Sequence, residues 1–337
     1  MGVDSRWPKM ALVTADTRDG FITTPMGDHW NMYYWANVLQ AYHLSYETLR
    51  ANPSRLDEFD WAICSGHPQY LETLLEVAEQ SKCRIAFFPE GDVSLYHDRV
   101  RCAGAEQFIY RIWNSVDFVA VVEEDKIPFY ELFTHVPVKF IHVPVPKRLV
   151  RGDYFVGVQG KSRDLLIYGD NNPNNPHIAF GVARRLRLPV SVTAVPITDV
   201  EFYGRYFGVS IARASEKTDQ DDYLRHWMGP SRVCIYPTNW IGTSRQVIAG
   251  AACGTPVVGN RDSHVMKRLF PELGVYNYDV RRIIELVTKL YADDEYYRSI
   301  VERSRSALEF YSEKNALGRL LLAMEYTELR QQSQTAS

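Results

Sequence analysis

The sequence lacks the features that mark membrane-spanning, secreted and nucleic-acid-binding proteins. No apolar run approaches the ~20 residues needed to cross a bilayer, and no apolar signal core precedes the first predicted strand. The net charge is −3, so there is no global basic field of the kind that drives non-specific binding to nucleic acid. These absences predict a globular protein of the cytoplasm with no transmembrane segment and no strong signal for nucleic-acid binding.

Cysteine is scarce and irregularly spaced. The chain has five cysteines, an odd number, and no two of them have the spacing of metal ligands. Several lie in or beside apolar segments, which favours buried, reduced thiols. We therefore predict reduced thiols, no metal site and no cofactor. The cysteines are Cys64, Cys83, Cys102, Cys234 and Cys253.

Three catalytic signatures are also missing. There is no Gly-x-Ser-x-Gly elbow, which disfavours a serine hydrolase. Neither a Walker loop nor a Gly-x-Gly-x-x-Gly turn follows the first predicted strand, which disfavours kinases and dehydrogenases. Aromatic residues make up 13% of the chain, and 21 of them are tyrosines. They form clusters near the N-terminus and at Phe202–Phe207. Such clusters pack in a core or an interface more often than they stack on a sugar or a base.

The first half of the chain alternates short apolar runs with helical patterns. Strands that alternate with helices indicate βαβ units and a mostly parallel sheet, and strands that are almost wholly apolar fit a sheet covered on both faces. The predicted strands are Met10–Thr14, Trp61–Cys64, Arg84–Phe88, Phe118–Val122 and Val138–Val143. The predicted helices are His29–Tyr42, Gln69–Gln80, Glu106–Asn114 and Glu123–Phe133.

The same pattern restarts after Pro144–Gly160, a segment with prolines, glycines and mixed charge that we predict to be the linker between two domains. The predicted strands that follow are Leu165–Tyr168, Val190–Val195, Val233–Tyr236, Val257–Gly259 and Tyr276–Tyr278. The predicted helices are Ile178–Arg187, Asp222–Met228, Arg245–Ala252, Val280–Tyr291, Asp294–Phe310 and Lys314–Glu328. Both halves therefore predict an α/β fold, and 337 residues suffice for two domains.

The most informative segment is Ser231–Asn260, which predicts a strand, a polar loop, a helix of small residues and a second strand. The loop contains Gly242 and leads directly into the helix. Helix N-termini carry unsatisfied N–H groups and a partial positive charge, so this one is a potential phosphate site.

This segment resembles the donor-binding core of GT-B glycosyltransferases, in the large retaining group that uses nucleotide sugars and includes sucrose and glycogen synthases. The residues that carry the resemblance are Tyr236-Pro237, Gly242 and the run Ala251–Val258. It implies two Rossmann-like domains that face each other across a cleft. The implied divisions are an acceptor-side domain over residues 1–150, a donor-binding domain over residues 151–314 and a closing helix, residues 315–330, that crosses back to the first domain.

The chain departs from this family at four donor contacts. The family usually has two glutamates, for the donor sugar and the ribose, where this sequence has Ile241 and Ala249. It also usually has an Arg and a Lys for the diphosphate, where this sequence has Asp170 and an asparagine. Either other residues hold the donor, or the protein is not a conventional transferase.

Two loops supply substitute donor contacts. In the loop before the helix, Gly242 lets the backbone approach a phosphate, although Thr243 or Ser244 could serve only as a helix cap. In the asparagine-rich loop 169–176, amides could hydrogen-bond a donor, although Asn and Pro also dominate ordinary turns. The predicted donor-binding residues are Gly169, Asn171, Asn172, Asn239, Gly242, Thr243, Ser244 and Arg245.

The resemblance places acceptor and catalytic groups in loops of the first domain. Asp28 and His29 follow the first strand, and Glu90 and Asp92 follow Arg84–Phe88. A carboxylate in a partly closed cleft can act as a base, although helix capping and turn formation explain the same residues. His67, after another strand, is a weaker candidate.

The sequence thus predicts a glycosyltransferase, hexosyltransferase-like, that moves a sugar from a nucleotide-sugar donor to an unidentified acceptor. Two alternatives remain open. One is a non-catalytic GT-B-like protein that binds a sugar, a nucleotide or another protein, and the other is an enzyme of phosphosugar metabolism such as an epimerase.

Overall fold

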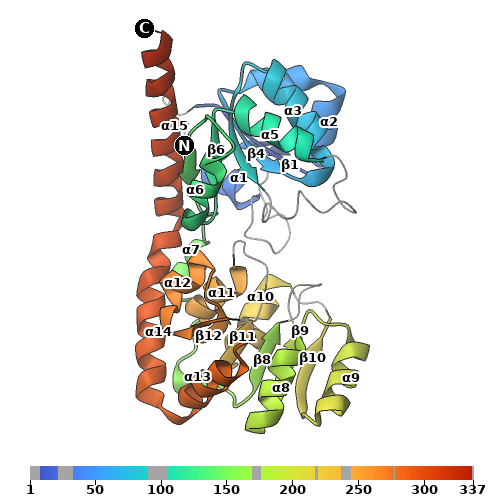
Figure 1. The fold of residues 1–337 in the computed structure, drawn as a ribbon, viewed down its shortest axis with the longest axis vertical. Helices are drawn as coiled ribbons and strands as arrows, with labels where there is room; N and C mark the ends of the chain where they lie inside the picture. Colours follow the sequence, from blue (N-terminus) through green and yellow to red (C-terminus); the bar gives the residue numbers. More distant parts are fainter. Residues whose placement is uncertain are drawn as a thin grey trace. The chain divides into compact units, whose positions relative to one another are not determined.

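The computed structural model describes residues 8–21, 33–89, 105–168, 176–216, 219–236, 244–276 and 278–335, and structural statements below refer to these residues. The chain forms two compact units (Figure 1). Unit 1 comprises residues 1–144 and 313–337, and unit 2 comprises residues 145–312. Each unit is an α/β assembly around one sheet.

The sheet of unit 1 has seven strands within the described residues, in the order β2-β3-β1-β4-β5-β6-β7. All neighbours are parallel except β2 and β3. The strands are β1 (Met10–Thr14), β2 (Gly20–Phe21), β3 (Tyr42–Ser45), β4 (Trp61–Gly66), β5 (Arg84–Pro89), β6 (Phe118–Val121) and β7 (Val138–Phe140).

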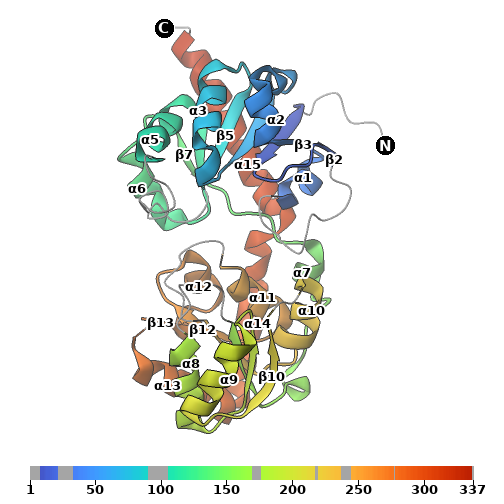
Figure 2. The ribbon, with the colours of Figure 1, turned by 90° about the vertical axis from the view of Figure 1, so that its right-hand side faces the viewer.

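Strand β1 shows why these strands are apolar along their whole length. Successive side chains of a strand point to opposite faces, so Ala11 and Val13 enter one hydrophobic cluster while Met10 and Leu12 enter another. Helices cover both faces, with α2, α3 and α5 in front of the sheet in Figure 2 and α15 behind it. A strand with both faces buried tolerates no polar alternation.

Most helices of unit 1 are short. They are α1 (Tyr33–Leu39), α2 (Tyr46–Ala51), η1 (Pro53–Glu58), η2 (Pro68–Tyr70), α3 (Leu71–Gln80), α5 (Ala105–Ser115), η3 (Glu124–Lys126), α6 (Ile127–Glu131) and α15 (Glu313–Thr335).

Helix α15 is the last helix of the chain and packs within unit 1. Ala316 and Leu320 are fully buried in the cluster that contains Met10 and Trp35. Trp61 of β4 donates a 3.2 Å hydrogen bond from Nε1 to the Glu328 carboxylate, which also pairs with Arg84. The closing helix therefore completes the core on one face of the unit 1 sheet.

The sheet of unit 2 is parallel throughout, in the order β10-β9-β8-β11-β12-β13 within the described residues. Every residue of β9, β11 and β12 is buried, as expected for central parallel strands. The strands are β8 (Leu165–Tyr168), β9 (Val190–Thr193), β10 (Ile211–Ser215), β11 (Val233–Tyr236), β12 (Val257–Asn260) and β13 (Gly274–Val275).

The second half of helix α11 in unit 2, Ala249–Cys253, consists of small residues, and it lies very close to β12. A Cβ atom added at Gly250 would come within 2.3 Å of a Val257 methyl group and 2.6 Å of the Thr255 carbonyl oxygen. The helices of unit 2 are α7 (Lys147–Arg151), η4 (Val158–Gly160), α8 (Pro176–Leu186), α9 (Ile197–Phe207), α10 (Gln220–Asp222), η5 (Tyr223–Met228), α11 (Arg245–Cys253), α12 (His264–Leu269), η6 (Pro271–Leu273), α13 (Val280–Ala292), α14 (Asp294–Leu308) and η7 (Glu309–Tyr311).

Two sequence predictions about local structure are wrong. The predicted helix His29–Tyr42 ends at Leu39, because Gln40 adopts a positive φ of 51° and Tyr42 begins strand β3. The last strand of the described residues is Gly274–Val275 rather than Tyr276–Tyr278. The division between the two units falls after Pro144, at the start of the predicted linker, and the rest of that segment belongs to unit 2, where it includes α7 and η4.

Several short elements were not predicted at all. Strand β10 and helix α9 fall in a stretch without clear periodicity, and α2 and α12 have only six residues each. The predicted burial of the thiols is confirmed for Cys64, Cys83, Cys234 and Cys253, whereas Cys102 lies outside the described residues. Among the described helices, none has the length and apolar character needed to span a membrane.

Candidate functional site

The carboxyl ends of the central unit 2 strands bring several polar and aromatic residues to one edge of the sheet. Because the strands are parallel, their last residues lie at the same edge. These residues are Tyr168 of β8, Thr193 of β9, Tyr236 of β11 and Asn260 of β12. The loops after Tyr168 and Tyr236 hold six predicted donor-binding residues that lie outside the described residues: Gly169, Asn171, Asn172, Asn239, Gly242 and Thr243.

Ser244, a predicted donor-binding residue, precedes α11 at this edge. It is buried in a left-handed conformation, with φ 46° and ψ 46°. Its hydroxyl forms a 2.8 Å hydrogen bond with the hydroxyl of Ser263 and makes no capping hydrogen bond to α11. The capping role that the sequence allowed for Ser244 is therefore wrong.

Other polar side chains gather at the starts of α11 and α12. Arg245 occupies the first position of α11 and is half-buried, and Gln246 beside it is buried. His264 opens α12, is 5% exposed and faces the rings of Phe310 and Tyr311. The sequence analysis did not identify Gln246, Ser263 or His264 as site residues. Isolated polar residues of this kind are usually part of an exposed helix turn, so no motif marks them.

Three tyrosines form an aromatic group at the same edge. The Tyr168 ring makes edge contacts with Tyr223 at 5.4 Å and with Tyr236 at 6.2 Å, between ring centroids. The Tyr223 hydroxyl is buried and has no hydrogen-bond partner within the described part of the chain. Burial raises the pKa of Tyr223 well above its ordinary value, so this side chain stays neutral.

Lys161 lies half-buried beside the loop that joins α11 to β12. Its ammonium group donates to the carbonyl oxygens of Gly229 and Cys253 and to the hydroxyl of Thr255. Burial lowers the pKa of Lys161 to about 7. Thr255, in the Ala251–Val258 run, therefore has a structural role, because its hydroxyl accepts from Lys161 and donates to the Met228 carbonyl.

The carboxyl edge of the unit 1 sheet carries the beginnings of the predicted acceptor loops. Strands β1, β4 and β5 are neighbours in the sheet and end at Thr14, Gly66 and Pro89. The predicted catalytic residues in the loops that follow β1 and β5 lie outside the described residues, namely Asp28, His29, Glu90 and Asp92.

A histidine that the sequence did not indicate lies at this edge of unit 1. His43 of β3 is fully buried, and its Nε2 lies 2.9 Å from Oγ1 of Thr14. Its Nδ1 contacts the carbonyl oxygen of Arg18, which can only accept a hydrogen bond. The network therefore assigns the proton to Nδ1 and leaves Nε2 to accept from the Thr14 hydroxyl. Burial lowers the pKa of His43, so the ring is held neutral.

Two aspartates surround this histidine. Asp16 pairs with Arg18 at 2.8 Å, and hydrogen bonding to Arg18 lowers the pKa of Asp16 to about 2. Asp19 accepts from the Ser45 N–H at 2.7 Å and from the Thr48 hydroxyl at 2.5 Å. These contacts tie the loop after β1 to β3 and α2, so it is braced where it leaves the sheet.

His67, the weaker sequence candidate, has a structural role in the described region. Its Nδ1 accepts a 3.4 Å hydrogen bond from the Gln69 N–H at the start of η2, and its ring lies 5.7 Å from that of Tyr70. This is the capping role that a histidine before a helix commonly plays.

The sequence of the chain matches no protein-family model and no curated protein. Its structure, by contrast, superimposes on solved structures over nearly the whole chain. Sucrose-phosphate synthase from Thermosynechococcus elongatus is 12% identical with a TM-score of 0.71, covering 98% of this chain and all of that one. Anabaena HepE in complex with UDP and glucose is 8% identical with a TM-score of 0.72, covering 95% of this chain and all of that one.

A third structure is an α-glucosyltransferase in complex with UDP-glucose and DNA that contains an abasic site. It is 10% identical with a TM-score of 0.62, covering 95% of this chain and 99% of that one. Two parallel Rossmann-like sheets and these matches together decide the architecture. The chain has the GT-B fold.

The GT-B resemblance noted in the sequence is thereby confirmed for the fold. Of the two positions where the retaining group usually has glutamates, only Ala249 lies within the described residues. It is 2% exposed inside α11, between the helix and the core. The GT-B scaffold is thus retained at α11, whereas the carboxylate is absent from that helix turn.

Proposed function

We propose that this GT-B protein is a glycosyltransferase that moves a sugar from a nucleotide-sugar donor to an unidentified acceptor, with retention of the anomeric configuration. The likeness to glycosyltransferase structures over more than nine tenths of the chain supports the proposal. Two of these relatives were solved with UDP and glucose or with UDP-glucose. The donor of this protein is accordingly a nucleoside diphosphate sugar.

The observation that carries the proposal is the state of the α11 N-terminus. Its N-cap residue, Ser244, bonds the Ser263 hydroxyl and, within the described residues, makes no side-chain capping hydrogen bond to α11. Arg245 is the first residue of that helix, and the positive end of the helix dipole lies at the same turn. A diphosphate at this point would satisfy the N–H groups and offset both positive charges.

The remaining donor contacts come from groups other than carboxylates. The edges of Tyr168 and Tyr236 border the loops that follow β8 and β11, and they offer aromatic surface to a base or a sugar. The asparagines Asn171, Asn172 and Asn239 belong to those loops. Neutral hydrogen bonds contribute about 0.5–1.5 kcal/mol each and charged ones about twice that. We therefore expect a donor Kd in the range of roughly tens of micromolar or weaker.

A second function is favoured by one specific observation. Ala249 places a buried methyl group where the retaining group usually has a carboxylate. A protein that binds a sugar, a nucleotide or another protein without turnover would not need that contact.

Donor binding and donor hydrolysis distinguish the two functions. A thermal-shift screen of nucleoside diphosphates and their sugars should find a stabilising ligand, since saturation to 100 times Kd stabilises by about 2.7 kcal/mol. Donor hydrolysis without acceptor, measured as released nucleoside diphosphate, then tests turnover. Binding without hydrolysis would favour the non-catalytic function, and neither binding nor hydrolysis would reject the transferase.

Variants locate the donor. Gly242→Val should weaken donor binding by blocking backbone approach, and Asn172→Ala and Ser244→Ala should each weaken it by roughly the loss of one hydrogen bond. Ser299→Ala is a matched control, because the Ser299 hydroxyl bonds only the exposed Tyr296 carbonyl on α14. If Asn172→Ala and Ser244→Ala both bind every donor as the parent does, this donor site is wrong.

A further inference from the structure

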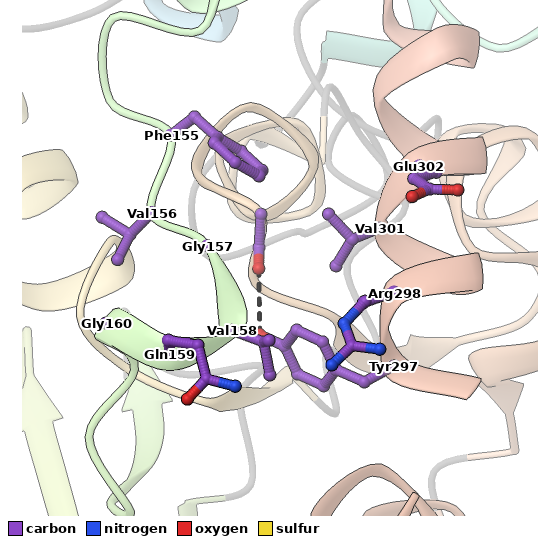
Figure 3. Close-up of a pocket in the computed structure, with 11 residues that line it drawn as sticks. Phe155, Val156, Gly157, Val158, Gln159, Gly160, Tyr297, Arg298, Val301 and Glu302 are labelled. Carbon is purple, nitrogen blue, oxygen red and sulfur yellow. Dashed lines mark hydrogen bonds between the residues drawn. The ribbon is translucent and has the colours of Figure 1, made fainter. Parts of the chain in front are cut away.

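Unit 2 contains a pocket at the opposite edge of its sheet from the candidate donor site. The segment Phe155–Gly160 leads toward the amino end of β8, and Gly254 precedes the amino end of β12. With one face of α14 they enclose about 520 Å³ (Figure 3), within the usual range of small-ligand sites. The lining residues are Phe155, Val156, Gly157, Val158, Gln159, Gly160, Gly254, Tyr297, Arg298, Val301 and Glu302.

The pocket has a built apolar wall. The Phe155 ring lies directly over Gly254, since a Cβ atom added there would come within 2.6 Å of the ring. The Arg305 guanidinium also lies over this ring, 4.0 Å from the ring centroid. These contacts hold the Phe155 ring in place. Because the residue is still 38% exposed, part of its aromatic surface remains accessible in the pocket.

Tyr297 contributes its ring to the pocket, because its hydroxyl is already used. The hydroxyl lies 2.9 Å from the Gly254 carbonyl oxygen and 3.0 Å from that of Arg232. Burial raises the pKa of Tyr297, so the side chain stays neutral. Together with Val156, Val158 and Val301 it makes the interior largely apolar.

Two charged side chains flank this apolar interior. Arg298 and Glu302 lie one helical turn apart on α14, with Val301 between them (Figure 3). In the described part of the chain neither group forms an ion pair or a side-chain hydrogen bond. Arg followed by Glu at i,i+4 is the weaker order for a helix pair, and the nearby Asp294 is paired with Arg232 at 2.5 Å. The Arg298 guanidinium is therefore available to a ligand.

We propose that this pocket binds a small amphipathic anion, with an aromatic or aliphatic body against Phe155, Tyr297 and Val301 and a single acidic group paired with Arg298. Glu302 at the other end disfavours a second negative charge on the ligand. This site goes beyond the donor site, with which it shares no residue. A carboxylate and a sulfonate offer Arg298 the same chemistry, so either serves as a probe.

The probes are 3-phenylpropionate, its neutral amide 3-phenylpropionamide, and the fluorescent sulfonate 8-anilinonaphthalene-1-sulfonate, titrated into the full-length protein. The parent should bind the fluorescent sulfonate at one site, and 3-phenylpropionate should displace it while the amide competes at least fivefold less well. Arg298→Met should weaken binding about tenfold. Glu302→Gln should strengthen it about twofold, because a repelling charge is removed.

A variant that fills the pocket with a large side chain tests whether the ligand binds there. Val301→Trp should abolish displaceable binding by occupying the pocket, and circular dichroism and thermal unfolding of each variant establish that it is folded. Should Val301→Trp perturb the fold, Gly157→Trp supplies the same test from the opposite wall, where a side chain meets open space. Equal affinity of the parent and Arg298→Met, equal competition by acid and amide, or unchanged binding in a folded filling variant would each overturn the proposal.

Discussion

The ammonium group of Lys161 donates a 2.7 Å hydrogen bond to Oγ1 of Thr255, within the core of unit 2. The same group donates to the carbonyl oxygens of Gly229, at 2.5 Å, and Cys253, at 3.0 Å. Cys253 ends α11, and its carbonyl oxygen also accepts a 3.1 Å hydrogen bond from the Val156 N–H, so Lys161 adds a second donor at this helix terminus. The pair therefore anchors α11 at the end remote from the candidate donor site.

Breaking this pair should destabilise unit 2. Lys161→Met removes the side-chain donor to the Gly229 carbonyl and to the Thr255 hydroxyl, whereas the Cys253 carbonyl keeps its backbone donor. We therefore expect a loss of about 1–3 kcal/mol in the free energy of unfolding. Thr255→Val should lose about 1–3 kcal/mol. Hydrogen exchange of the β11 and β12 amides measures both, and the double variant should lose less than the sum of the single variants by about 1 kcal/mol. Strict additivity would show that the two side chains do not act together.

Gly254, which lies between Cys253 and Thr255, is required for two separate reasons. Gly254 has φ +69°, and an added Cβ atom would lie 2.6 Å from the Phe155 ring. Gly208, the matched control, has φ +63° but no atom within 4 Å of an added Cβ. Gly208→Ala should cost about 1–2 kcal/mol from the left-handed backbone alone, and Gly254→Ala should cost at least about 1 kcal/mol more. Urea unfolding compares them, and equal losses would mean that the Phe155 contact adds nothing.

Helix α15 offers a matched pair of leucines for testing its role in unit 1. Leu320 is fully buried and Leu322 is 67% exposed. Leu320→Ala should cost about 2–5 kcal/mol, because it leaves a cavity beneath the sheet, whereas Leu322→Ala should stay within about 0.5 kcal/mol of the parent. Thermal unfolding and the rate of proteolysis near residue 313 provide the measurements. Equal effects at the two positions would contradict the packing of α15 in the unit 1 core.

His43 predicts a specific pH dependence of stability. Its pKa is lowered in the folded protein relative to the ordinary value of 6.5, so the unfolded chain binds the proton more readily. The free energy of unfolding contributed by His43 should therefore fall as the pH drops below 6.5 toward the folded pKa. The hydrogen bond to the Arg18 carbonyl and the charges of Asp16 and Asp19 oppose part of this lowering of the pKa, whereas the charge of the Arg18 side chain adds to it.

The control for this effect is His43→Gln, which keeps hydrogen-bonding groups but does not titrate. Its free energy of unfolding should vary less between pH 6.5 and 5 than that of the parent. The comparison uses urea unfolding at several pH values. Parallel curves for the two proteins over this range would show that His43 does not titrate differently on folding.

The sequence predicted the strands that precede the acceptor and donor loops, but not the conformation of the loops themselves. Strands β1, β8 and β11 have their predicted bounds, because each is an apolar run that ends at turn-forming residues. Strand β3 was not predicted, and its first residue, Tyr42, was placed at the end of a predicted helix. Tyr42–Ser45 is too short to show a period, and its partner β1 lies about thirty residues earlier in the chain. His43, which lies on that strand, was missed for the same reason.

The sequence by itself determined the α/β class, the two repeated patterns of strand and helix, and the α11 segment that resembles GT-B enzymes, because periodicity and turn residues act over a few neighbouring positions. Only the tertiary structure decided what each polar group does. It paired Ser244 with Ser263, set Lys161 against Thr255 and placed Phe155 beside Val301 of α14. These partners are 19, 94 and more than a hundred positions apart, so hydrogen bonding and burial were settled by chain packing that no local pattern records.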